Sequence, residues 1–233
     1  MKHFAKRLLA AALCLCLTVS ALPAPALAEA DASAMQETFH ISTADDLLQL
    51  AQNCRLDSWS RNRTVVLDAD IDLTGVDFEG IPSFGGDLEG QNHIISGLSL
   101  TGSGSVQGLF RYIQQGAVVR DLHVSGTVSP AGTRATVGGI AGQNAGTIEN
   151  CSFDGTVTGT TQIGGIAGIN TVTGILTGCS VSGSVYGSHF IGGAAGQNDG
   201  VISACTNDAG INTTVSQNEV NLEDLTLEDL LKT

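Results

Sequence analysis

Four acidic residues have the spacing of a partial calcium-binding loop. Asp68, Asp70 and Asp72 alternate with apolar residues, and Glu79 follows at the twelfth position counted from Asp68. An EF-hand loop uses carboxylates at this spacing but needs glycine at its sixth position, where this chain has Leu73. The alternation instead predicts an extended strand, which would spread the carboxylates along one solvated face. We therefore expect weak calcium binding by these four residues at most, and a solvated strand face otherwise.

A second group of reactive residues is a recurring cysteine. Near copies of one glycine-rich phrase place Cys151, Cys179 and Cys205 at the same position: GGIAGQNAGTIENCSF, GGIAGINTVTGILTGCSV and GGAAGQNDGVISACTN. Earlier and weaker copies put Leu98 and Leu122 there, which indicates an inward apolar position where free cysteine acts as a small hydrophobe. A disulfide between adjacent copies and a metal site are the alternatives. Stacked side chains run parallel rather than toward each other, and no CxxC pair occurs, so we favour buried thiols.

A catalytic site would need reactive side chains that converge. One group could do so, namely Arg120, Asp121 and His123 with Glu149 one copy further along, but outward residues on a strand are usually only solvated. Metallopeptidase and hydrolase motifs are missing, because no histidine begins HExxH and no Gly-x-Ser-x-Gly occurs. The glycine-rich phrases lack the Gly-Lys-Ser/Thr of a phosphate-binding loop. We predict no catalytic residues, no cofactor and no enzyme activity.

The N-terminal segment and the net charge of the chain restrict the compartment and the binding partners that we expect. Residues 1–28 have the features of a secretory signal peptide: a basic start, an apolar run over residues 8–21 that is too short for a lasting membrane anchor, and Ala-Leu-Ala at 26–28. The formal net charge is −13, and all acidic residues lie beyond residue 28. We expect a secreted protein, with residues 29–40 as a linker, that is repelled by nucleic acid and by anionic membranes.

The remaining elements would position these residues in one all-β domain over 41–212. Ser42 is expected to cap a helix over 43–54, and a half-buried strand is expected over 64–73. From about 94 to 212 the chain repeats short strands and glycine corners with a period of 24 to 29 residues, which is typical of a solenoid whose equivalent residues stack from coil to coil. The helix would cover one open end of this solenoid. Residues 213–233 are expected to be a short capping helix or an acidic tail.

The ordered series FGGDLEGQNHIISGLSL, GLFRYIQQGAVVRDLHVSG and GGIAGQNAGTIENCSFDGTV resembles bacterial extracellular proteins that carry the GLUG motif. The resemblance covers most of residues 41–212. It implies a right-handed parallel β-helix, as in adhesin-like surface proteins and in the non-catalytic region of IgA-protease-type metallopeptidases. It also implies that the chain could be part of a longer surface protein.

These observations lead to two hypotheses about function. The first is a secreted, non-enzymatic β-solenoid that displays a polar ladder to a host or cell-wall ligand, either protein or glycan. The second is a polysaccharide-active β-helix enzyme, or an accessory fragment of a surface protease. Two carboxylates placed 5–10 Å apart in an acidic groove would favour the second hypothesis.

Overall fold

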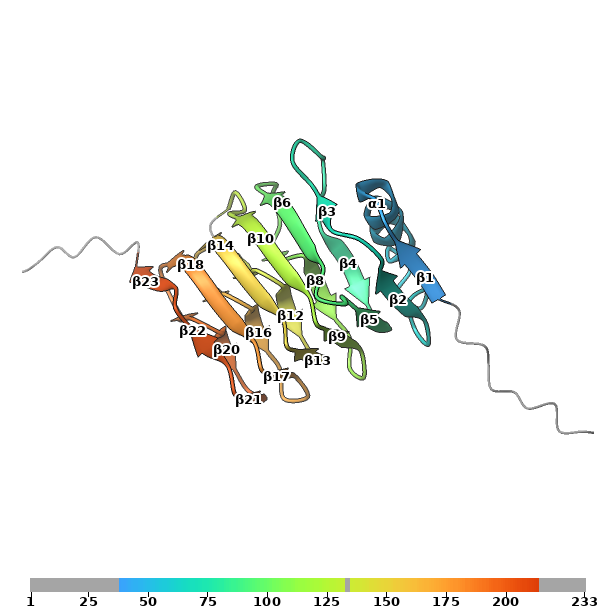
Figure 1. Ribbon diagram of the computed structural model, residues 1–233. Coiled ribbons are helices and arrows are strands. Elements are labelled where there is room, and N and C mark those ends of the chain that lie inside the picture. Colours follow the sequence, from blue (N-terminus) through green and yellow to red (C-terminus); the bar gives the residue numbers. More distant parts are fainter. Residues whose placement is uncertain (1–37, 133–134, 214–233) are drawn as a thin grey trace, which may run out of the picture. The chain divides into compact units, whose positions relative to one another are not determined.

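The strands of this protein pair in parallel with strands one coil away, rather than with their neighbours in sequence. The computed structural model describes residues 38–132 and 135–213. Within these residues the chain forms a β-solenoid with four parallel sheets, numbered here in the order in which each complete coil contributes its strands (Figure 1). The predicted signal peptide, the linker up to residue 37, and the predicted C-terminal helix or tail from residue 214 onward lie outside the described residues.

The first two sheets hold most of the strands. Sheet 1 consists of β1 (Thr38–Ile41), β2 (Thr64–Leu67), β5 (Asp87–Glu89), β9 (Val118–Arg120), β13 (Thr147–Glu149), β17 (Ile175–Thr177) and β21 (Val201–Ser203). Sheet 2 consists of β3 (Ile71–Asp72), β6 (Ile94–Leu100), β10 (His123–Val128), β14 (Ser152–Thr158), β18 (Ser180–Gly187) and β22 (Thr206–Asn207), with β23 (Gly210–Thr213) also paired to β18.

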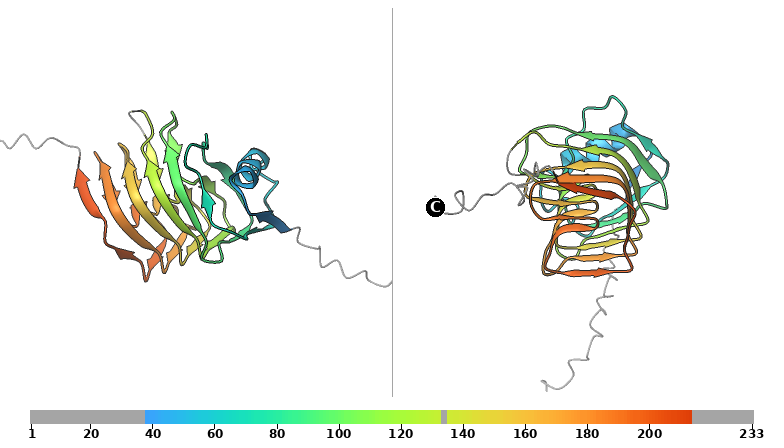
Figure 2. Two further views of the ribbon diagram at one scale, coloured as in Figure 1. Left: turned by 45° about the horizontal axis from the view of Figure 1, so that its top comes forward. Right: turned by 90° about the vertical axis from the view of Figure 1, so that its left-hand side faces the viewer.

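The other two sheets are built from shorter strands. Sheet 3 consists of β7 (Val106–Gln107), β11 (Thr136–Gly138), β15 (Gln162–Gly164) and β19 (Ile191–Gly192). Sheet 4 consists of β4 (Ile81–Phe84), β8 (Phe110–Ile113), β12 (Ala141–Asn144), β16 (Ala167–Asn170) and β20 (Ala195–Asn198). Each complete coil therefore supplies one strand to every sheet, and the coils stack one behind another (Figure 2). No helix in the described part of the chain has the length and apolar character needed to cross a bilayer.

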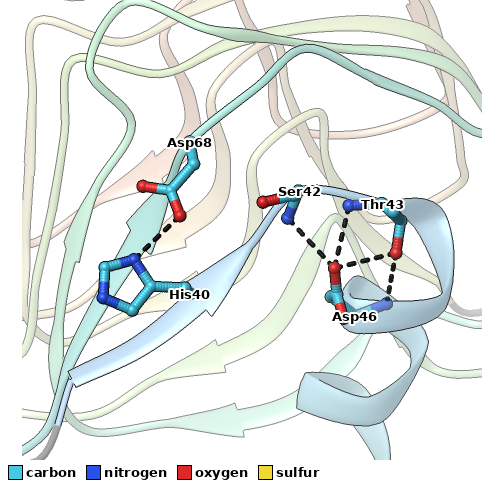
Figure 3. A network of polar contacts seen from close by, with 5 residues as sticks. All are labelled: His40, Ser42, Thr43, Asp46 and Asp68. Carbon is cyan, nitrogen blue, oxygen red and sulfur yellow. Dashed lines mark hydrogen bonds and ion pairs between the residues drawn. The ribbon is translucent and has the colours of Figure 1, made fainter.

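The predicted N-terminal helix is present as α1 (Ala44–Asn53), although its cap differs from the prediction. Thr43, not Ser42, is the N-cap, because the Thr43 side chain accepts the Asp46 backbone N–H while the Asp46 carboxylate accepts the Thr43 N–H (Figure 3). This capping box satisfies N–H groups that have no partner inside the helix. Leu47 and Leu50 are fully buried, and α1 packs against β1 and β4 at the N-terminal end of the core. The first strand begins at Thr38, inside the stretch expected to be a linker.

The strand expected over residues 64–73 is instead two strands in two sheets. The chain turns a corner between β2 and β3, and β2 joins sheet 1 while β3 joins sheet 2. Val65 and Leu67 are buried before the corner, and Ile71 and Leu73 after it. Both strands thus point alternate residues into the same core, so the period of two in the sequence continues through the corner and conceals it.

The repeat alignment gives the correct register for most of the core. Val124, Phe153 and Val181 pair in succession, as do Val128, Val157 and Val185, and all six side chains are buried. The exception is the earliest copy, where the predicted register is wrong. Leu98 lies opposite Gly126 rather than Leu122, and Leu100 lies opposite Val128 rather than Val124, so the observed register is four residues away from the predicted one. One extra residue in β6 near Gly97, which has a φ of 69°, also changes the register by one residue within the strand.

The last described coil is more open than the coils before it. Ile202 stands one coil beyond Leu176 and is 37% exposed, whereas Leu176 is fully buried. Ile211 stands beyond Val185 and is 43% exposed, whereas Val185 is fully buried. Inward positions of the solenoid therefore become accessible at this end.

Candidate functional site

Three of the four acidic residues considered for calcium use their carboxylates in separate local contacts. Asp68 pairs with His40 at 2.8 Å (Figure 3), and Asp70 pairs with His93 at 2.9 Å and accepts the Ile94 N–H. Asp72 accepts the Thr74 N–H at 2.9 Å. Glu79, whose backbone carbonyl accepts a hydrogen bond from Arg111, lies on the segment between β3 and β4. No group of three His, Cys, Asp or Glu side chains in the described residues is placed to share an ion.

Hydrogen bonds at the corner between sheets 1 and 2 favour the ionised form of two of these carboxyl groups. The Ile94 backbone N–H, followed by the His93 side chain, holds the pKa of Asp70 below its ordinary value. The Thr74 hydroxyl and N–H do the same for the pKa of Asp72. Asp70 and Asp72 each accept hydrogen bonds from their own neighbouring donors. These two carboxylates therefore stabilise the corner between sheets 1 and 2.

The group around Arg120 is likewise divided among different partners. The Arg120 side chain forms an ion pair with Glu89 at 3.3 Å that lacks the alignment of a hydrogen bond. Asp121 accepts a hydrogen bond from the Asn150 amide at 3.2 Å, and His123 Nδ1 lies 2.6 Å from the Ser152 hydroxyl. Glu149 occupies the position one coil beyond Arg120 in sheet 1. The side chains thus form ladders between coils and not a set that converges on one reacting atom.

The cysteines lie where an inward apolar position was predicted. Cys151 and Cys179 are 1% exposed, Cys205 is half-buried, and all three are free thiols. The Cys151 thiol donates to the carbonyls of Val119 and Glu149. Burial raises the pKa of Cys151 above its ordinary value and raises that of Cys179 to about 12. A thiol that stays protonated is a poor nucleophile and metal ligand, so Cys151 and Cys179 act as core residues.

A buried asparagine ladder is the main polar feature that the sequence analysis missed. Asn144 and Asn170 are fully buried in sheet 4, and the Asn144 amide donates to Asn170 Oδ1 at 2.9 Å. The Asn170 amide donates in turn to Asn198 Oδ1 at 2.8 Å, and it also donates to the carbonyls of Gly174 and Val201. The ladder satisfies backbone groups at the corner between sheets 4 and 1. Its signal is the asparagine that follows Gly-Gln or Gly-Ile in each glycine-rich phrase.

The outward surface of sheet 2 carries the most regular set of polar side chains. Three columns run from coil to coil across β10, β14 and β18: His123, Ser152 and Ser180; Ser125, Asp154 and Ser182; and Thr127, Thr156 and Ser184. We call these nine residues the hydroxyl face. Adjacent coils lie about 4.8 Å apart, and outward residues of one strand lie about 6.6 Å apart. The result is a grid of short side chains, most with a hydroxyl that can both donate and accept hydrogen bonds.

The side-chain hydrogen bonds within the hydroxyl face involve only two of its three columns. Ser182 donates to the Asp154 carboxylate at 2.8 Å, and His123 is bonded to Ser152. The column of Thr127, Thr156 and Ser184 makes no side-chain hydrogen bond within the described residues, and all three side chains are partly or fully exposed. Those hydroxyls are therefore available to a ligand.

Comparisons with known proteins agree with the repeat and the fold. Residues 133–158 match the family model of the GLUG motif. Halomucin of Haloquadratum walsbyi is 33% identical over 137 residues, which is 52% of this chain and only 2% of halomucin. A crystal structure of a proposed immunoglobulin A1 protease from Bacteroides ovatus has a TM-score of 0.53 at 18% identity, covering 75% of this chain and 67% of that one. The GLUG resemblance and the β-solenoid fold are thus confirmed.

Proposed function

We propose that this protein is an extracellular, non-catalytic module that binds a hydroxyl-rich polymer, such as a host or cell-wall glycan, along the hydroxyl face. The observation that carries the proposal is the register of β10, β14 and β18, which repeats one pattern of short polar side chains from coil to coil. A polymer with repeating hydroxyls meets the same donors and acceptors on each coil. Many weak contacts then add up without a deep pocket.

Two other features support a location outside the cell. Residues 1–28 have the composition of a secretory signal, and the GLUG motif at 133–158 is one that the sequence analysis associates with extracellular proteins. The rigid solenoid suits such a role because it holds its outward side chains in place before a ligand arrives. Less side-chain entropy is then lost on binding.

A sedimentation assay with insoluble cell-wall polysaccharide, followed by a glycan array, tests the proposal. The variant Thr127→Ala/Thr156→Ala/Ser184→Ala removes one column of the hydroxyl face, and we expect its binding to fall at least tenfold. The matched control, Thr147→Ala/Thr177→Ala/Ser203→Ala, removes three hydroxyls from sheet 1 and should bind like the unchanged protein. Equal losses in both variants, or no retention of the unchanged protein by any polymer, would contradict the proposal.

The same preparation tests the competing hypothesis of a polysaccharide-active enzyme. Glu89 and Glu149 occupy the same outward column of sheet 1 two coils apart, with Arg120 between them. Two coils correspond to about 9.6 Å, which is at the upper limit of the separation between the two carboxyl groups of inverting glycosidases. Release of reducing ends that disappears in Glu89→Gln or Glu149→Gln would favour the enzyme. We expect none, because Arg120 holds Glu89 in an ion pair.

A further inference from the structure

Aromatic side chains replace polar ones at the corner that follows β18, which is the long orange strand in Figure 1. The chain reads GTVTGTTQIGG at the preceding corner and GSVYGSHFIGG at this one, so the two corners have equal length. Tyr186 pairs with Thr158 in sheet 2, and the register of sheet 3 places Phe190 one coil beyond Gln162. Two polar residues are thus exchanged for aromatic ones at stacked positions.

Tyr186 continues the row of outward side chains that β18 contributes to the hydroxyl face. Val185 is fully buried, so the residues on either side of it, Ser184 and Tyr186, lie on the outward side of the strand. Ser184 and Tyr186 are two residues apart, which corresponds to about 6.6 Å along the strand. A ligand that lies on the hydroxyl face at Ser184 is therefore beside the Tyr186 ring.

Phe190 has an unfavourable backbone conformation and a ring that faces water. Its φ is 49°, in the left-handed region that bulky residues rarely adopt, and neither Thr136 nor Gln162 at the stacked positions has a positive φ. Its carbonyl accepts the Ile163 N–H at 3.0 Å, which holds this part of the backbone in place. Phe190 is 65% exposed, so core packing does not account for a phenylalanine here. A strained and exposed aromatic residue points to a role outside stability.

An aromatic ring beside a row of hydroxyls matches the two kinds of surface on a sugar unit. The hydroxyls of the sugar can exchange hydrogen bonds with serine and threonine. The C–H bonds on the face of a pyranose ring carry a small positive charge, which suits the negative face of an aromatic ring. Glucose and N-acetylglucosamine expose the most continuous C–H faces, because all their ring substituents are equatorial.

The charge of this part of the chain favours a neutral sugar. Residues 135–213 contain no lysine or arginine and therefore no permanent cation. Asp154 lies on the hydroxyl face itself, and the whole chain has a formal net charge of −13. An anionic polymer would be repelled by this surface and would find no permanent cation there to pair with.

We propose that Tyr186 and Phe190 form an aromatic anchor for one unit of a neutral polymer of glucose or N-acetylglucosamine type, whose neighbouring units lie along the hydroxyl face. The inference rests on the proposed function and narrows its ligand from hydroxyl-rich polymers to neutral pyranose polymers. The hydroxyl columns repeat from coil to coil, so by themselves they allow a polymer to bind in several registers. An anchor at one coil fixes which part of the polymer lies there.

Isothermal titration calorimetry of the full chain tests the anchor. The probes are cellohexaose and chitohexaose, with hexagalacturonate as the anionic comparison and N-acetyl-tetraalanine amide as the peptide comparison. We expect at least one neutral hexasaccharide to bind at least tenfold more tightly than hexagalacturonate. Binding of neither neutral hexasaccharide, or tighter binding of hexagalacturonate or of the peptide, would overturn the proposal.

Two variants remove the rings one at a time. Tyr186→Thr restores the residue of the preceding coil, and Phe190→Asn introduces a residue that tolerates a positive φ. Each should weaken binding of the neutral hexasaccharide at least fivefold, while Phe190→Tyr, which keeps a ring, should bind like the unchanged protein. Phe190→Asn should also melt at the same temperature as the unchanged protein or higher, because it relieves backbone strain. Weaker binding without weaker folding separates a ligand role from a structural one.

The matched control removes an exposed ring from a different sheet. Tyr112 in β8 of sheet 4 is 41% exposed, and the preceding coil has Ser83 at the same position. Tyr112→Ser should leave binding of the hexasaccharide unchanged. An equal loss in Tyr112→Ser and in the two ring variants would overturn the proposal, because any exposed aromatic residue would then have the same effect.

The anchor and the hydroxyl face can fail independently. If Tyr186→Thr and Phe190→Asn bind like the unchanged protein while Thr127→Ala/Thr156→Ala/Ser184→Ala binds more weakly, the anchor is wrong and the proposed function stands. Sedimentation velocity tests whether the ring instead serves a contact between copies. Self-association that disappears in Phe190→Asn, with unchanged binding of the hexasaccharide, would assign Phe190 to that contact and overturn the proposal.

Discussion

Asn144 donates a hydrogen bond from its side-chain amide to the side-chain oxygen of Asn170, one coil further along, at 2.9 Å. Both residues are fully buried. The preceding coils place Ile113 and Phe84 in the same column of sheet 4, so the core changes from apolar to polar along one line of the solenoid. The polar part stays stable because each asparagine pairs with its neighbour and with backbone groups at the corner.

The first prediction concerns this ladder. Asn170→Asp keeps the size of the side chain but replaces a donating amide with an oxygen that only accepts. It therefore removes the hydrogen bonds to Asn198, Gly174 and Val201 and buries a charge. We expect the free energy of unfolding to fall by about 3 kcal/mol or more. Urea denaturation at neutral pH measures it.

The matched control is Asn198→Asp, at the exposed end of the same ladder. Water can solvate its carboxylate, so we expect a loss of less than about 1 kcal/mol. Equal losses of unfolding free energy in the two variants would show that the buried hydrogen bonds of Asn170 do not stabilise the protein as predicted.

The second prediction concerns the stacked glycines of sheet 2. Gly155 has a φ of 150°, and a Cβ atom there would collide with the Gly126 carbonyl of the coil before it. Gly155→Ala should therefore destabilise the protein by at least about 2 kcal/mol. Gly102→Ala is the control, because a Cβ at Gly102 meets nothing within 4 Å. Thermal unfolding gives the melting temperatures of the two variants. Similar values would contradict the predicted steric collision at Gly155.

The third prediction concerns alkaline pH. Burial raises the pKa of Cys54 to about 11 and that of Cys179 to about 12, from an ordinary value of 9.0. The folded state holds these protons more tightly than the unfolded state does. Their contribution to stability is therefore complete below about pH 9 and is lost as the pH rises toward 11–12.

Urea unfolding at pH 7.5, 9 and 10.5 measures this loss. The variant Cys54→Ala/Cys179→Ala should be less stable at neutral pH, because it opens small cavities, but its stability should fall less steeply between pH 9 and 10.5. Alkaline slopes that are the same in both proteins would show that other groups cause the loss.

The fourth prediction concerns secretion. If residues 1–28 are a signal peptide, the full chain expressed in a bacterial host should reach the culture medium or the cell surface with Glu29 as its first residue. Amino-terminal sequencing of the exported protein measures this. Lengthening the apolar run or replacing Ala26 and Ala28 with large residues should block the cleavage. Accumulation of the uncleaved, unchanged protein in the cytoplasm would contradict the prediction.

The repeat made the core predictable wherever a recurring residue fixes the alignment of the copies. Phe153 and Val181 could be aligned from the sequence because each follows the recurring cysteine by two residues. Leu98 could not, because its copy lacks the recurring cysteine, and the observed register is four residues away from the predicted one. Leu98 and Leu100 stand two residues apart, so the pattern of apolar residues is plausible in either register. Only the backbone pairing decides between the two.

The buried polar residues were less predictable from the sequence than the apolar core was. The repeat of asparagine at positions 144 and 170 is evident in the sequence. A polar residue in a glycine-rich segment is nevertheless expected to face water. Only the fold shows that Asn144 and Asn170 are buried.

The accessible inward residues of the last described coil bear on how such a protein can change in evolution. Any further segment with the same spacing of apolar residues could settle on Ile202 and Ile211, and each added coil would lengthen the particle by about 4.8 Å. Tandem duplication of one gene segment would then extend the reach of the molecule without redesign of its interior. Selection could therefore change the length of such a protein one coil at a time.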